Sequence, residues 1–188
     1  NAIEYASEVV AYWRGRADAW RDSGPFDEAY PLPYPSASTT MIEGGNGVNI
    51  VPERCAVTLE FRALAGVDDA TVLEELREFC AGVEARMKAE NPVASVTVEV
   101  LASTIGLDMP ADADVVLLGR ELGLESTPDK VTYGTEAGVF TAGGIPCVVC
   151  GPGDIGDAHR ADESIALDQL ADCETFLARL IAHLRVSR

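Results

Sequence analysis

Residues 55–62 read Cys-Ala-Val-Thr-Leu-Glu-Phe-Arg, and apolar and polar side chains alternate along them. Because successive side chains of a strand point to opposite faces, this alternation predicts a strand with Val57, Leu59 and Phe61 on one face. Residues 69–89 follow with apolar side chains at three- and four-residue spacing, which predicts a long amphipathic helix. Its apolar stripe comprises Val72, Leu73, Leu76, Phe79, Cys80, Val83 and Met87.

The segments on either side extend this pattern. Residues 3–21 have apolar side chains at helical spacing, residues 39–43 are typical of a short strand, and residues 95–101 alternate strictly, with three valines on one face. The predicted order is therefore helix, strand, strand, helix, strand. That order matches a ferredoxin-like α+β fold that lacks its first strand.

The pattern changes after Ser103. Residues 112–122 and 135–142 predict helices, and residues 145–150 form a continuous apolar run. Such runs are typical of parallel strands buried on both faces, so we expect an α/β arrangement here. A last helix is expected to be capped by Asp168. Its inward face would comprise Leu170, Cys173, Leu177, Ile181 and Leu184.

These changes divide the chain into two predicted domains, residues 1–104 and residues 105–188. The second is too short for a complete doubly wound α/β domain, and the first lacks a strand. Both observations favour a chain that is one part of a longer protein.

Charge and composition exclude several classes of function. The chain has 31 acidic and 14 basic residues and a net charge of −17, which disfavours binding to nucleic acid. No apolar run is long enough to cross a bilayer, so we expect no membrane partner. The five cysteines form no regular framework, which favours a reducing, cytoplasmic compartment. Cys147 and Cys150 lie in the apolar run, so we interpret them as buried thiols.

His159 is the candidate metal ligand. It lies in the loop after the predicted strand 145–150, where α/β folds commonly place their ligands. Asp162 and Glu163 are close enough in sequence to hold the imidazole in one tautomer. The alternative is an exposed loop histidine that caps the next helix, and spacing alone does not exclude it.

Arg62, Gly134 and Thr135 are candidate ligand-binding residues, each with a structural alternative. An arginine at a strand end can bind a substrate carboxylate through two parallel hydrogen bonds, or it can pair with Glu60. Gly134 and Thr135 can present an amide and a hydroxyl to an anion at a helix N-terminus. Equally, Thr135 can cap that helix.

The ordered motifs together resemble the zinc-dependent deacylases and carboxypeptidases that include acetylornithine deacetylase and succinyl-diaminopimelate desuccinylase. Proteins of this family have a lid domain and a catalytic domain. In the part that resembles the lid domain, the similar segments are Asn1-Ala2-Ile3-Glu4-Tyr5-Ala6, Asn49-Ile50-Val51-Pro52-Glu53 and Leu59-Glu60-Phe61-Arg62. In the part that resembles the catalytic domain, they are Tyr133-Gly134-Thr135-Glu136-Ala137, Cys150-Gly151-Pro152-Gly153, Ala158-His159 and Asp162-Glu163. The last group most resembles the acetylornithine deacetylase branch, which serves arginine biosynthesis.

This resemblance implies a ferredoxin-like lid domain that mediates homodimerisation, followed by the C-terminal portion of a zinc-peptidase-like catalytic domain. It implies two zinc ions, with cobalt or manganese as possible substitutes, and a metal-bound water that attacks the amide of an N-acyl amino acid. By position, His159 matches a metal ligand. Asn49, Arg62, Gly134 and Thr135 match substrate-binding positions, and Arg62 would contact the substrate carboxylate.

The other metal ligands and the general-base glutamate of the family have no counterpart in these 188 residues. A zinc site needs at least three protein ligands. We therefore expect this chain alone to be inactive and the longer protein to be the deacylase, with N-acetylornithine as the favoured substrate. The alternative is a non-catalytic dimerisation or ligand-binding module that lacks the metal-binding half.

Overall fold

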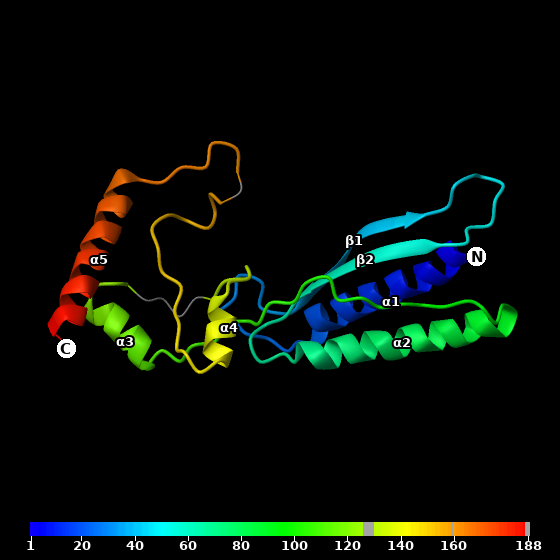
Figure 1. Cartoon of the computed structure of the whole chain (residues 1–188), viewed down its shortest axis with the longest axis horizontal. Helices are drawn as coiled ribbons and strands as arrows, with labels where there is room; N and C mark the ends of the chain where they lie inside the picture. The colour runs from blue at the N-terminus through cyan, green and yellow to red at the C-terminus, as the bar shows by residue number, and fades with distance from the viewer. Residues whose placement is uncertain (126–129, 159, 187–188) are drawn as a thin grey trace. The chain divides into compact units, whose positions relative to one another are not determined.

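The structure is a computed structural model of the whole chain, and it describes residues 1–125, 130–158 and 160–186 (Figure 1). The chain forms two compact units. The N-terminal unit comprises Asn1–Gly106 together with Asp129–Gly134, and the C-terminal unit comprises Leu107–Pro128 and Thr135–Arg188. Residues 130–134 thus group with the N-terminal unit, although the sequence pattern places them in the second part.

The N-terminal unit is an antiparallel hairpin packed on two long helices, as its α+β pattern predicts. Its elements are α1 (Ala2–Ser23), β1 (Ser36–Gly44), β2 (Cys55–Arg62) and α2 (Asp69–Glu90). The register pairs Ser36 with Arg62 at one end of the hairpin and Gly44 with Cys55 at the other. Helix α1 contacts both strands and α2, so it forms the middle of the unit (Figure 1).

The core of this unit lies between α1, α2 and the hairpin, and it confirms the predicted apolar faces. Its buried members are Trp13, Trp20, Val72, Leu76 and Cys80, and Leu59 and Phe61 of β2 pack against them. The Trp13 and Phe61 rings meet edge to face with their centroids 6.1 Å apart, and the Trp20 and Phe61 rings stack at 6.0 Å. Aromatic burial therefore joins the first helix to the central strand.

The predicted strand at residues 95–101 is not formed. Val96 and Val98 pack against the core, as their alternation predicts. However, the backbone of this segment pairs with no strand among the described residues, and the Val96 N–H donates to a Glu84 carboxylate oxygen at 3.3 Å. Alternation in a sequence reports which side chains are buried, whereas a strand also needs a neighbouring backbone.

Gly24 ends α1 in a conformation that favours glycine. Its φ of 74° and ψ of −165° lie in a region that other residues rarely occupy, and an added Cβ would approach the Phe26 ring to 2.7 Å. We expect Gly24→Ala to lower the free energy of unfolding by about 1–3 kcal/mol, as measured by urea denaturation. Gly82→Ala is the matched control, because a Cβ there meets no atom within 4 Å. Equal stability of both variants would contradict this prediction.

The C-terminal unit contains three helices, α3 (Asp114–Glu121), α4 (Ala137–Ala142) and α5 (Leu167–Val186). The predicted strand at residues 145–150 is wrong, because no strand is present in the described part of this unit. A continuous apolar run forms a parallel strand only when other strands lie beside it. Without such a sheet, Cys150 is exposed rather than buried.

The predicted inward face of α5 is also wrong in this structure. Leu170, Leu177, Ile181 and Leu184 are exposed, and Cys173 is half-buried. Helical spacing identifies an apolar face correctly, but burial requires a surface to pack against. Asp168 lies in the first turn of α5 rather than before it, and its carboxylate accepts the Gln169 N–H at 2.8 Å. None of the helices described here is long and apolar enough to cross a membrane.

Candidate functional site

Arg62 lies at the end of β2 with its guanidinium held in place from two sides. Its Nε donates to Glu60 Oε1 at 2.6 Å, and its Nη1 donates to the Thr132 carbonyl oxygen at 3.0 Å. The pairing with Glu60, which the sequence left as the alternative, is therefore present. The side chain is still 53% exposed, so an anion can reach it. Binding of a substrate carboxylate stays a prediction.

Lys130 forms an ion pair and a backbone hydrogen bond that the sequence pattern does not predict. Its Nζ lies 2.8 Å from Asp27 Oδ2 and 5.5 Å from the centroid of the Tyr30 ring, and its backbone N–H donates to the Ala29 carbonyl at 2.8 Å. No local signal could have linked Lys130 to Asp27, because the two residues are 103 positions apart.

Hydrogen bonds from Lys130 and from the Ala29 N–H lower the pKa of the Asp27 carboxyl below its usual range. Because this pKa is lower in the folded protein than in an unfolded chain, ionised Asp27 contributes its full stabilisation at pH values above the ordinary pKa of aspartate. The ion pair is therefore present at neutral pH, and it is lost only as the pH falls through the lowered pKa.

Gly134 and Thr135 lie where the chain passes from the N-terminal to the C-terminal unit. A Cβ on Gly134 would lie 3.1 Å from the Thr104 methyl carbon, so the backbone here runs close to residue 104. The Thr135 hydroxyl accepts the Ala137 N–H at 3.1 Å, at the start of α4. This bond gives Thr135 a role in the first turn of the helix, and an anion site at these residues stays a prediction.

Asn49 lies apart from Arg62. It is exposed in the loop of residues 45–54 that joins β1 to β2, whereas Arg62 lies at the opposite end of the hairpin. At the usual rise of a strand, the length of β2 alone separates the two ends by roughly 20 Å. One protomer therefore does not bring these two predicted substrate-binding residues together.

The predicted metal ligand His159 lies outside the described residues. Asp162 and Glu163 are both exposed, and Asp162 has a φ of 64°, which aspartate tolerates better than most residues. The described residues contain no group of three or more histidine, cysteine or acidic side chains that could hold a metal ion. The metal site therefore stays a prediction.

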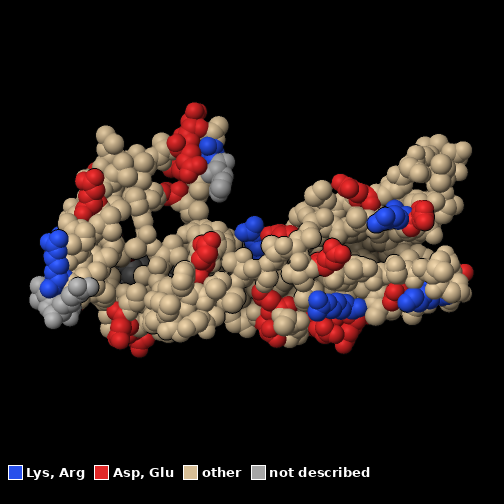
Figure 2. All heavy atoms as spheres, in the orientation of Figure 1, with Lys and Arg blue, Asp and Glu red and all other residues tan. Residues whose placement is uncertain are grey.

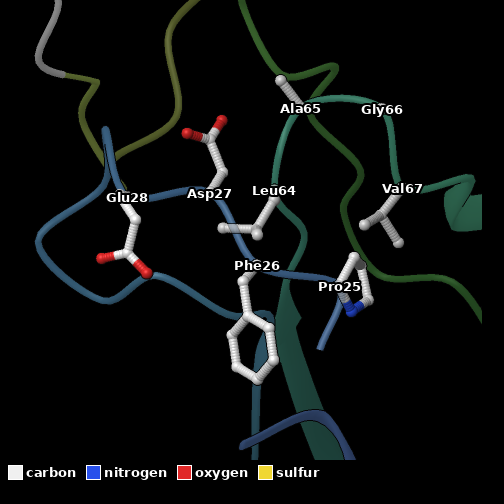
Figure 3. Close-up of a pocket in the computed structure, with 8 residues that line it drawn as sticks. All are labelled: Pro25, Phe26, Asp27, Glu28, Leu64, Ala65, Gly66 and Val67. Atoms are coloured by element: carbon white, nitrogen blue, oxygen red, sulfur yellow. The ribbon is translucent and has the colours of Figure 1, made fainter. Parts of the chain in front are cut away.

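The N-terminal unit has a shallow pocket of about 450 Å³ where residues 25–28 meet residues 64–67 (Figure 3). The Asp27 carboxylate and the Phe26 ring point in opposite directions from this loop (Figure 3). None of the predicted site residues that the structure describes lines this pocket. On the face shown in Figure 2, acidic side chains are spread over the surface rather than gathered in one patch.

Comparison with known proteins identifies relatives along most of the chain. Residues 1–88 match the family model described as a peptidase dimerisation domain. Acetylornithine deacetylase of Myxococcus xanthus is 31% identical over 84% of this chain and 40% of its own length. Acetylornithine deacetylase of Proteus mirabilis is 30% identical over 96% of this chain and 45% of its own length.

The chain thus spans less than half the length of these two relatives. The dimerisation-domain match covers α1, the hairpin and most of α2, while the deacetylase matches continue into the second half. The chain therefore belongs to the M20 family, because its first half matches that family's dimerisation domain and most of its length is similar to acetylornithine deacetylases.

Proposed function

We propose that this chain is the C-terminal part of a metal-dependent amidohydrolase that removes the acyl group from an N-acyl amino acid, with N-acetylornithine as the favoured substrate. The observation that carries the proposal is the similarity to acetylornithine deacetylases over 84–96% of the chain. The acidic surface also suits a substrate that carries an ammonium group better than one with two carboxylates.

In this proposal, the residues of this chain bind and orient the substrate. Arg62 would contact the substrate carboxylate, because its guanidinium is already fixed by Glu60 and Thr132 and keeps an exposed surface. Gly134 and Thr135 would line the pocket beside the acyl amide. Asn49 would contribute from a second protomer, because within one protomer it lies at the opposite end of the hairpin from Arg62.

The described residues do not fit a zinc site by themselves, since they offer no cluster of three metal-ligating side chains. In the longer protein, His159 would serve as one ligand, with Asp162 and Glu163 nearby to hold it. The remaining ligands and the water-activating base would come from segments that these 188 residues do not contain. We therefore expect no hydrolysis by this chain alone.

An activity assay on two samples tests the proposal. A protein that contains this chain together with the metal-binding half, loaded with zinc or cobalt, should release free amine from N-acetylornithine. The 188-residue chain under the same conditions should release none. If the longer protein releases no amine from a panel of N-acyl amino acids, the proposal is overturned. If the chain alone releases amine, the metal ligands and the base do not have to come from outside these 188 residues, and that part of the proposal is overturned.

We also propose that the N-terminal unit forms a homodimer. The match of residues 1–88 to a peptidase dimerisation domain supports this, and so does the exposure of Met41 and Ile42 on β1. In the two-stranded sheet, β1 pairs only with β2 among the described residues, so its other edge can accept a second strand. Sedimentation equilibrium should give twice the mass of the monomer, and a monomer at micromolar concentration would contradict the proposal.

A non-catalytic dimerisation or ligand-binding module is the second candidate. The match of residues 1–88 to a dimerisation domain favours it. The coding sequence ahead of Asn1 distinguishes the two. An upstream frame that encodes histidine, aspartate and paired glutamates supports the amidohydrolase, whereas a start codon at that point supports the module.

A further inference from the structure

Residues 130–134 contact the rest of the N-terminal unit along most of their length. The Lys130 backbone N–H donates to the Ala29 carbonyl, its ammonium pairs with Asp27, and the Thr132 carbonyl accepts from Arg62. Gly134 then runs close to Thr104. All these partners belong to the same unit. We call residues 130–134 the strap.

The ion pair at the start of the strap, between Asp27 and Lys130, is held in place by neighbouring groups. Asp27 Oδ1 accepts the Ala29 N–H at 3.0 Å, which leaves Oδ2 to meet the Lys130 ammonium at 2.8 Å. The two side chains are only 26% and 29% exposed, and the Tyr30 ring lies beside the ammonium. Tyr30 is itself buried, and its hydroxyl accepts the Ala65 N–H at 3.1 Å. Restricted motion and partial burial favour such a pair over a freely exposed one.

The second contact that holds the strap is the hydrogen bond from Arg62 to the Thr132 carbonyl, and other residues hold Arg62 in place. Glu60 fixes the guanidinium of Arg62 through Oε1 and accepts the Ser38 hydroxyl through Oε2 at 3.2 Å. The Glu60 carbonyl in turn accepts the Trp13 indole N–H at 3.3 Å. The Thr132 carbonyl is therefore bonded to a side chain that the hairpin and α1 hold in place.

We propose that Lys130 latches the strap onto Asp27 and that it is thereby a positioning residue for Gly134 and Thr135. The latch itself follows from the contacts within the N-terminal unit. Its effect on substrate binding rests on the proposed function, in which Gly134 and Thr135 line the substrate pocket. Lys130 does not need to touch the substrate for this role.

Limited trypsin digestion of the 188-residue chain tests the latch without any activity assay. Trypsin must bind the Lys130 side chain to cut the Lys130–Val131 bond, so the ion pair protects that bond. Asp27→Asn removes the charge but keeps an oxygen for the Ala29 N–H. Because cleavage follows the population of the opened state, we expect cutting at Lys130 to be roughly threefold or more faster in this variant.

The digestion has an internal reference and a matched control. Arg54 lies exposed in the loop between β1 and β2, so cutting there should be fast and equal in every variant. Glu28→Gln makes the same change in charge one residue away and should leave cutting at Lys130 unchanged. Lys130→Arg should remain protected. Wild-type cutting at Lys130 as fast as at Arg54, or no acceleration in Asp27→Asn, would overturn the latch.

Kinetics of the longer protein test the positioning role. We expect Asp27→Asn to raise KM for the N-acyl amino acid about three- to tenfold, with kcat changed by less than about twofold, because a displaced strap weakens binding more than chemistry. Faster trypsin cutting with an unchanged KM would keep the latch and overturn the positioning role. A longer protein without deacylase activity would overturn the proposed function, and the digestion result would stand independently of it.

Discussion

Replacing Trp13 with alanine is expected to lower the free energy of unfolding by about 3–5 kcal/mol, the usual cost of truncating a buried tryptophan. Trp13 is only 3% exposed, and its ring contacts both Trp20 and Phe61 edge to face. Its indole N–H also donates to the Glu60 carbonyl. The substitution therefore removes a contact that joins α1 to β2 and leaves a cavity in the core of the N-terminal unit.

Urea denaturation followed by tryptophan fluorescence and circular dichroism measures this loss. Since small domains are stable by only about 5–15 kcal/mol, the variant should unfold at a much lower urea concentration. Trp13→Phe should lose less, because it keeps an aromatic ring but no indole N–H. Val93→Ala, at an exposed position, is the control. A midpoint for Trp13→Ala equal to that of this control would contradict the described core.

Replacing Arg62 with alanine in the longer protein is expected to lower kcat/KM for N-acyl amino acids about 10- to 100-fold. Hydrogen bonds to charged groups contribute roughly 1.5–3 kcal/mol, which corresponds to this range. The expectation depends on the proposed contact between the guanidinium and the substrate carboxylate. Arg62→Lys should recover only part of the loss, because an ammonium lacks the two parallel donors of a guanidinium.

A substrate without a carboxylate separates the two contributions of Arg62. If Arg62 binds the substrate carboxylate, an N-acyl amine should be hydrolysed equally by the wild type and by Arg62→Ala. If Arg62 acts only through its bond to the Thr132 carbonyl, both substrates should lose rate by the same factor. Unchanged kinetics with both substrates would remove Arg62 from the site.

Helices α1 and α2 and strand β2 were predictable because their signals are local. The bounds of α1, β2 and α2 lie within two residues of the segments expected from their apolar spacing. The buried stripe of α2 contains Val72, Leu76, Cys80 and Val83, as its helical period predicts. Such periodicity needs only the chain's own geometry, so it can be recognised in the sequence alone.

The predictions that were wrong concern elements whose pairing or burial depends on residues far away in the chain. Residues 95–101 and 145–150 have the composition of strands, yet neither is paired in the structure. Backbone pairing requires a neighbouring strand, and no neighbour is specified by the segment itself. The exposed apolar face of α5 has the same cause, since a helix buries its stripe only against another surface.

The candidate site shows the same distinction. The residues Asn49, Arg62, Gly134, Thr135 and His159 could be named from their motifs, because a motif reports the chemical type and the order of side chains. The pairing of Lys130 with Asp27, the bond from Arg62 to Thr132 and the separation of Asn49 from Arg62 could not. Those relations depend on distances between residues far apart in the chain, which are set when α1, the hairpin and the strap pack together.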